Sequence, residues 1–108
     1  MSTSLGAFQW LLLMAVTHLD EDAYGVTIHR LIQDRTGRSA TSGAIYTTLE
    51  RLERQGYVTS RLERGGDDRG GRSKRYYRLT PTGRRALARE HASWQEMSRG
   101  LMARLGKS

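Results

Sequence analysis

The sequence predicts a mainly α protein with one small β-hairpin: a winged helix-turn-helix, made of three helices and a two-stranded wing, followed by a C-terminal helix. Three observations predict it. Apolar residues recur with helical spacing in three segments before residue 56, they alternate in two short segments flanking a glycine-rich stretch, and helical spacing returns after Pro81. A winged helix-turn-helix has this order of elements.

The first predicted helix covers residues 5–19. Its segment WLLLMAV, residues 10–16, is apolar on every side, whereas a surface helix of a globular protein shows one apolar stripe. We therefore expect this helix to be buried on two faces. The same run is the longest apolar run in the chain, and it is much shorter than the roughly 20 residues that cross a bilayer.

The second predicted helix runs from about residue 23 to residue 35. The acidic residues 20–22 are good N-cap and first-turn residues for it. Gly37 supplies the left-handed residue that commonly ends a helix. One apolar face is expected, with Tyr24, Ile28, Leu31 and Ile32 at positions i, i+4, i+7 and i+8.

The third predicted helix starts after a cap at Thr41 or Ser42 and runs to Gln55. Residues 37–40, which join it to the second helix, suit the short turn of a helix-turn-helix. Ile45, Leu49 and Leu52 should point inward. The outward face then carries Ser42, Gly43, Tyr46, Thr47, Glu50, Arg51 and Arg54.

Two strands are predicted at residues 57–62 and 74–79, where the apolar period changes from 3.6 to 2. Val58 and Leu62 should share one side of the first strand, and Tyr77 and Leu79 one side of the second. The glycine-rich, charged segment ERGGDDRGGR between them should project as a loop. Thr80 and Pro81 then provide an N-cap and a first helical position for a last helix that reaches about Leu105.

Positive charge is concentrated in the second half of the chain. The net charge is +7, but residues 1–50 carry three basic and five acidic residues, while residues 51–108 carry fifteen basic and six acidic residues. Segregated positive charge attracts polyanions, so nucleic acid is the first candidate partner and an anionic membrane surface the second. Sixteen of the 18 basic residues are arginines, which suits bidentate phosphate and guanine contacts, although a GC-rich coding bias would give the same excess.

Composition excludes several classes of protein. The chain has no cysteine, and its three histidines have no mutual spacing typical of a metal site, so we expect no metal and no cofactor. It has no nucleophile elbow, phosphate loop or catalytic carboxylate pair, so we expect no enzymatic activity. We expect no membrane span and a location in the cytoplasm. The chain should form one compact unit, with residues 1–80 as the winged helix-turn-helix DNA-binding domain and residues 81–108 as a C-terminal dimerisation helix.

Candidate DNA contacts lie in the turn, the third helix and the wing. Small or hydroxyl residues at the start of the third helix permit close approach, Tyr46, Thr47 and Arg51 can reach bases or phosphates, and wing cations suit the backbone or the minor groove. The predicted DNA-binding residues are Arg38, Thr41, Ser42, Gly43, Tyr46, Thr47, Arg51, Arg69, Arg72 and Lys74. The alternatives are a capped, solvated helix face and a solvated turn partly neutralised by Asp67 and Asp68.

The last helix carries an apolar stripe that lacks a partner in the sequence. Leu87, Trp94 and Leu101 repeat at intervals of seven, which predicts a seam covered by a second copy of the chain. Trp94 is either interface packing or a stacking wall for a small planar apolar effector, with first-helix aromatic residues nearby. The predicted interface and effector residues are Phe8, Trp10, Leu87, His91, Trp94, Met97, Leu101 and Leu105.

Several segments together carry a family resemblance. The segments LGAFQWLLLMAV, DAYGVTIHRLIQDRTG, SGAIYTTLERLERQGYV and GGRSKRYYRLTPTGRRAL resemble the PadR family of bacterial transcriptional regulators over roughly residues 5–89. The most specific elements are the Tyr24–Gly25 pair, the stretch 43–46 with Leu49 and Leu52, and the ending of the wing at Arg75, Tyr76, Tyr77, Leu79 and Thr80.

The resemblance implies a homodimeric repressor that binds a pseudo-palindromic operator and is released by a small molecule or another signal. Only one helix follows the wing, so the chain resembles the short class, in which the last helix pairs with the first helix of the other subunit. A short dimer has less room for a dedicated effector pocket. The alternative is a winged-helix module for protein interaction or RNA binding, with RGGR in the wing touching RNA without operator specificity.

Overall fold

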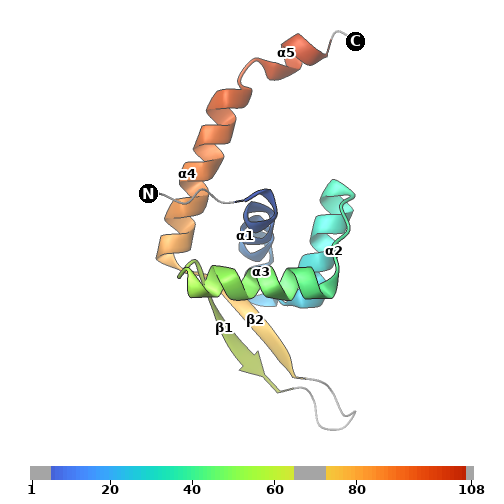
Figure 1. Cartoon of the computed structure of the whole chain (residues 1–108), viewed down its shortest axis with the longest axis vertical. Coiled ribbons are helices and arrows are strands. Elements are labelled where there is room, and N and C mark those ends of the chain that lie inside the picture. Colours follow the sequence, from blue (N-terminus) through green and yellow to red (C-terminus); the bar gives the residue numbers. More distant parts are fainter. Residues whose placement is uncertain (1–5, 65–72, 107–108) are drawn as a thin grey trace.

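Helices surround a central first helix, and a two-stranded wing projects from one end of the molecule (Figure 1). The computed structural model describes residues 6–64 and 73–106. The elements are α1 (Ala7–Leu19), the 3-10 turn η1 (Asp20–Asp22), α2 (Gly25–Thr36), α3 (Ser42–Arg54), β1 (Val58–Glu63), β2 (Lys74–Leu79), α4 (Pro81–Ser98) and α5 (Leu101–Leu105). This order confirms the winged helix-turn-helix and the C-terminal helix predicted from the sequence.

The hydrophobic core is built around α1. This helix contacts α2, α3, β2 and α4, and its buried residues are Leu12, Leu13, Ala15 and Val16. The other elements add Ile28 and Ile32 from α2, Ile45, Leu49 and Leu52 from α3, and Val58 and Tyr77 from the hairpin. Contacts with four elements explain why residues 10–16 are apolar on every side.

The start of α2 differs from the sequence prediction. The acidic residues 20–22 were expected to cap α2, but they form η1, and the N-cap is Tyr24. The Tyr24 backbone N–H donates to Thr27 Oγ1 at 3.0 Å, so the hydroxyl of Thr27 performs the capping. Ala23 is buried and Tyr24 pairs with β2, which holds both residues in an extended conformation before the helix begins. Tyr24 therefore lies outside the apolar face of α2 that it was predicted to share.

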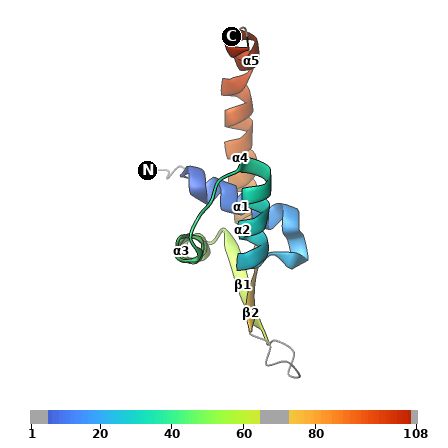
Figure 2. The ribbon, with the colours of Figure 1, turned by 90° about the vertical axis from the view of Figure 1, so that its right-hand side faces the viewer.

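The hairpin is an antiparallel two-stranded sheet in which Val58 pairs with Leu79 and Leu62 with Arg75. Tyr77, which is buried, and Leu79, which is half-buried, share one side of β2, as expected. Leu62 shares one face of β1 with Val58, as predicted, but it is 57% exposed, because this end of the strand lies beyond the core. Only the base of the hairpin packs on the helices, and the residues farther along the strands extend past them (Figures 1 and 2).

The last helix is shorter than predicted. It begins as expected, with Thr80 Oγ1 accepting from Gly83 N at 2.9 Å and Pro81 in the first position. It does not continue to Leu105 but ends at Ser98, because Gly100 adopts a left-handed φ of 78° and α5 starts in a new direction. The end of α4 and all of α5 extend past the other helices in both views (Figures 1 and 2).

Candidate nucleic-acid interface

The helix-turn-helix consists of α2, residues 37–41 and α3. Gly37 ends α2 with a φ of 72°, in the left-handed conformation expected from the sequence. Thr41 is the N-cap of α3, and its Oγ1 accepts from Ala44 N at 3.0 Å. This cap fixes the direction of the first turn, where the small residues Ser42 and Gly43 are exposed. Arg38, in the turn, is exposed as well.

The face of α3 turned away from the core is polar and exposed. Ile45, Leu49 and Leu52 are buried on its inner side, as predicted. Thr47 and Arg51, two of the predicted DNA-binding residues, are exposed on the outer side. The structure therefore brings together the predicted residues of the turn and of α3, in the order Arg38, Thr41, Ser42, Gly43, Tyr46, Thr47 and Arg51.

Tyr46 differs from the other α3 residues because half of it is engaged within the protein. Its side chain is 47% exposed, and its ring lies against the buried first residue of α2, Gly25. A Cβ atom added at Gly25 would lie 2.7 Å from Tyr46 Cζ, closer than real Cβ contacts. The Tyr46 ring would therefore have to shift if residue 25 carried a side chain.

The wing is joined to α3 by a polar network that sequence reasoning did not find. Ser60 Oγ donates to Glu53, with distances of 3.0 and 2.9 Å to Oε1 and Oε2, and accepts from Arg75 Nη1 at 3.1 Å. The contact links α3, β1 and β2 through one hydroxyl. Only the strand pairing of Ser60 with Tyr77, which places residue 75 on the same face, could have indicated it from the sequence.

The opposite face of the wing carries aromatic rings and cations. Tyr24 and Tyr76 pack with ring centroids 5.2 Å apart, and Tyr77 N donates to Ala23 O at 2.9 Å. The Lys74 ammonium lies 4.6 Å from the Tyr24 ring centroid, and the Arg61 guanidinium lies 4.9 Å from that of Tyr76. The ammonium group of Lys74, a residue predicted to contact DNA, thus lies against the Tyr24 ring on this face of the wing. Arg69 and Arg72 lie outside the described residues.

A hollow of about 330 Å³ separates α3 from β2. It is lined by Tyr46, Thr47, Glu50, Glu53, Arg75 and Tyr77. Burial is the main cause that raises the pKa of the Tyr77 phenol above its ordinary value, and nearby Glu53 adds to the effect while Arg75 opposes it. The folded structure therefore favours the neutral phenol over the phenolate at alkaline pH.

The predicted interface residues lie on α1, α4 and α5. Trp10 stacks on Trp94 within the chain, with ring centroids 5.4 Å apart and planes at 19°, and His91 lies beside Trp10. Phe8 and Leu87 are half-buried against the core. Trp94 is still 54% exposed and Met97 86% exposed. Beyond the break at Gly100, Leu101, Met102 and Leu105 are exposed too, so the stripe continues in a changed direction.

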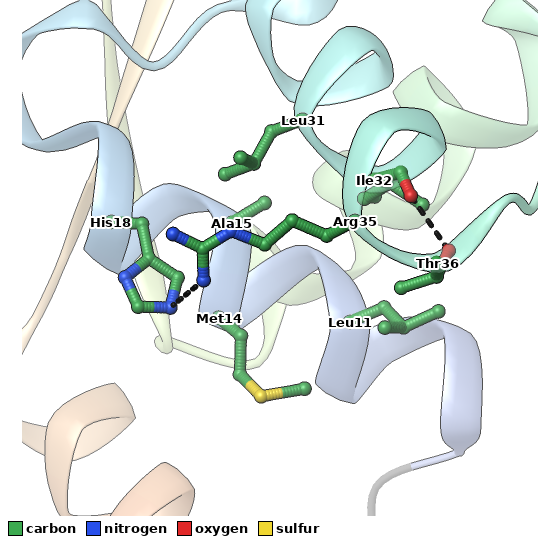
Figure 3. Close-up of a pocket in the computed structure, with 8 residues that line it drawn as sticks. All are labelled: Leu11, Met14, Ala15, His18, Leu31, Ile32, Arg35 and Thr36. Carbon is green, nitrogen blue, oxygen red and sulfur yellow. Dashed lines mark hydrogen bonds between the residues drawn. The ribbon is translucent and has the colours of Figure 1, made fainter.

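The outward side of α1 is flanked by two apolar hollows. One, of about 160 Å³, lies between α1 and α2 and includes Leu11, Met14 and Leu31 (Figure 3). At one end of it Arg35 Nη1 and His18 Nε2 lie 3.4 Å apart. The other, of about 320 Å³, lies between α1 and α4 and shares Met14 and His18. The buried indole N–H of Trp10 has no hydrogen-bond partner among the described residues.

Within residues 6–64 and 73–106, no helix is long and apolar enough to cross a membrane. The same part of the chain contains no group of three histidine, aspartate or glutamate side chains placed to hold a metal ion.

Residues 12–89 match the Transcriptional regulator PadR-like family. The matched range includes all of α2, α3 and the wing. The chain belongs to this family. It is a transcriptional regulator and not an enzyme, as the sequence predicted. The transcriptional regulator Rv3488 of Mycobacterium tuberculosis is 34% identical over 83 residues, which cover 77% of this chain and 73% of that protein.

Solved structures of PadR proteins share the fold. A PadR family transcription regulator from Clostridium difficile superposes with a TM-score of 0.76 over 93% of this chain and 98% of that one, at 22% identity. Bacillus subtilis PadR in complex with operator DNA superposes with a TM-score of 0.67 at 25% identity. The match covers 77% of this PadR-like chain and 46% of the Bacillus subtilis chain, so this chain spans less than half the length of that one.

Proposed function

We propose that this PadR-like regulator acts in the cytoplasm as a homodimer that binds a pseudo-palindromic DNA operator with sequence specificity. The observation that carries the proposal is the outward face of α3, exposed and polar, with small residues at its capped N-terminus and basic wing strands beside it. Its shape and charge suit the major groove. The likeness to Bacillus subtilis PadR in complex with operator DNA supports the same use of the fold.

Different residues have different proposed tasks. Thr47 and Arg51 would meet base edges, because they lie on the outward side of α3, and Ser42 and Gly43 would allow the backbone to approach the groove. Tyr46 would present its free edge while its ring stays on α2. Arg38 and Thr41 would contact phosphates near the turn, and Arg69, Arg72 and Lys74 would contact phosphates or the adjacent minor groove from the wing.

The proposed dimer uses α1, α4 and α5. The apolar stripe from Trp94 to Leu105 is exposed, and the outward side of α1 is bordered by apolar hollows that could receive side chains of a second copy (Figure 3). Two recognition helices would then read half-sites about one turn, roughly 34–36 Å, apart.

We further infer that the dimer represses transcription by occupying its operator and that a signal releases it. Trp94 offers one free face in the proposed seam, with the flexible side chain of Met97 nearby, a composition suited to a planar apolar effector. Such a ligand lowers operator affinity only if it binds the DNA-incompetent arrangement of the two α3 helices more tightly than the competent one.

The test is selection of bound DNA from a random duplex pool, followed by footprinting upstream of the protein's own gene. We expect a pseudo-palindromic consensus and two protected half-sites about one helical turn apart. Single-stranded RNA bound at least as tightly as the selected duplex would instead support the RNA-binding alternative. Binding of all duplexes with equal affinity would contradict an operator-specific regulator.

A further inference from the structure

An acidic side chain, Glu50, stands on the outward face of α3. The buried residues Ile45, Leu49 and Leu52 mark the inner side of this helix, and a step of 100° per residue places Thr47, Glu50 and Arg54 on the other side. All three outer residues are exposed. Glu50 therefore points in the same general direction as the residues proposed to meet DNA.

The two acidic residues of α3 have different surroundings. Glu53 accepts from Ser60 Oγ and takes part in the link between α3 and the wing. Glu50 makes no hydrogen bond and no ion pair with any residue that the structure describes, although it lies at the edge of the hollow between α3 and β2. Glu53 thus has a hydrogen-bonded role in the link to the wing, whereas Glu50 has no hydrogen-bond or ion-pair partner within this part of the chain and acts there only through its charge, which adds to the raised pKa of Tyr77.

A carboxylate in this place opposes non-specific binding. DNA phosphates repel it. A carboxylate that enters the groove also loses water of hydration, and this loss costs free energy unless a hydrogen-bond donor takes the place of the water. The neighbouring Arg51 and Arg54 attract the same phosphates. An acid among basic residues on this face is therefore favourable only where the duplex offers a hydrogen-bond donor at one position.

We propose that Glu50 is a specificity-determining residue that selects cytosine in each operator half-site by accepting a hydrogen bond from the cytosine N4 amino group. The inference rests on the proposed DNA-binding function. In the major groove, guanine and thymine present the acceptors O6, N7 and O4, which repel a carboxylate. Adenine offers its N6 amino group, but its N7 acceptor repels the second carboxylate oxygen, so cytosine fits best. Repulsion of the other bases contributes as much to the selection as attraction to cytosine.

The experiment compares selection from a random duplex pool by the full-length protein and by E50Q, E50A and E53Q. The E53Q variant is the matched control, because it removes the same charge from the same helix at a residue already held by Ser60. Selected sequences with each base in turn at the affected position are then titrated individually. Glu50 is exposed, so its variants should remain folded, which the thermal unfolding transition checks.

We expect the unsubstituted protein to prefer cytosine over thymine by about 5- to 150-fold at one position in each half-site. E50A should lose this preference and bind random duplex more tightly, and E50Q should shift the preference toward adenine, which a glutamine amide recognises through N6 and N7. E53Q should retain the preference for cytosine. Unchanged base preferences in both Glu50 variants, or the same shift in E53Q, would overturn the assignment while leaving an operator-specific regulator intact. Absence of any consensus for the unsubstituted protein would overturn the proposed function and the assignment together.

Discussion

The ring of Tyr46 on α3 covers the backbone of Gly25 at the start of α2 and leaves no space for a Cβ atom there. We expect Gly25→Ala to destabilise the protein by about 1–3 kcal/mol through overpacking. Helix propensity alone predicts the opposite, a gain of up to about 1 kcal/mol. The free energy of unfolding in urea decides between them, and a variant at least as stable as the parent would contradict the packing argument.

The same contact has a direct control. In the background of Tyr46→Ala the ring is gone, so Gly25→Ala should cost little or nothing. A double-mutant cycle on the two substitutions then isolates the interaction energy of the pair. Equal costs of Gly25→Ala in the presence and in the absence of the ring would show that another contact is responsible.

Arg51 and Lys74 should respond differently to alanine substitution. Arg51 lies on the outward side of α3, and its loss as a base contact should cost about 1–3 kcal/mol and relax specificity. Lys74 lies on the wing, and its loss as a phosphate contact should weaken binding to all duplexes and reduce the salt slope by about one.

Titrations on operator and random duplex at several salt concentrations separate these effects. Arg89→Ala on the exposed surface of α4 serves as the control for removing one charge away from α3 and the wing. If Lys74→Ala leaves both the affinity and the salt slope unchanged, the described part of the wing is simply solvated.

The order of elements was predictable because it depends on local signals. The period of apolar residues, Thr80 with Pro81, and Gly37 each act within a few residues, and all three predictions were confirmed. The start of α2 was missed because a non-local interaction decides it: Tyr24 pairs with Tyr76, which is 52 residues later in the chain. The shared face of Val58 and Leu62 was predicted correctly, but the exposure of Leu62 could not be predicted, because alternation identifies a face of a strand and not how far the helices extend under it.

The candidate interface was predictable in part for the same reason. Exposure of residues on α3 follows from helical period, so the exposure of Ser42, Gly43, Tyr46, Thr47 and Arg51 was predicted correctly. The network of Glu53, Ser60 and Arg75 depends on the register of the strands, and the stack of Trp10 on Trp94 depends on how α1 meets α4. Neither the register nor the helix contact is fixed by the pattern of one segment alone.

Met97 tests the proposed dimer. Its side chain is 86% exposed in the single chain, so Met97→Glu should not unfold the protein. In a dimer seam the new carboxylate would be desolvated, and the dissociation constant of the dimer should rise by about 100-fold or more, equivalent to ~3 kcal/mol. Sedimentation at micromolar concentration measures the mass. Ala92→Glu, on the side of α4 turned away from Trp94, is the matched control, and a fully dimeric Met97→Glu protein would rule out this seam.

Tyr77 should make the stability of the folded protein depend on pH in the alkaline range. Burial raises the pKa of its phenol in the folded protein above the value in the unfolded chain. Above the unfolded pKa the unfolded state therefore binds fewer protons than the folded state, and the free energy of unfolding should fall as the pH rises beyond about 10. Tyrosinate absorbance should show one phenol titrating later than the others, and Tyr77→Phe should abolish that late step. Simultaneous titration of all the phenols would contradict the effect of burial.

The stack of Trp10 on Trp94 determines how a planar effector could bind. Trp10 occupies one face of the Trp94 ring, and Trp94 is still 54% exposed, which leaves its other face free. A flat apolar compound should therefore stack on the free face without displacing Trp10, and Trp10→Phe should retain binding while simplifying the fluorescence to Trp94 alone. Trp94→Ala should weaken binding by about 10-fold or more, because it removes both the stacking contact and the buried area.

Titration of planar aromatic compounds by tryptophan quenching, repeated with operator DNA present, measures both the affinity for the compound and the release of DNA. Binding that survives Trp94→Ala would assign the compound to another surface, and binding without any change in operator affinity would leave Trp94 as interface packing in a regulator controlled by its abundance or by a different signal.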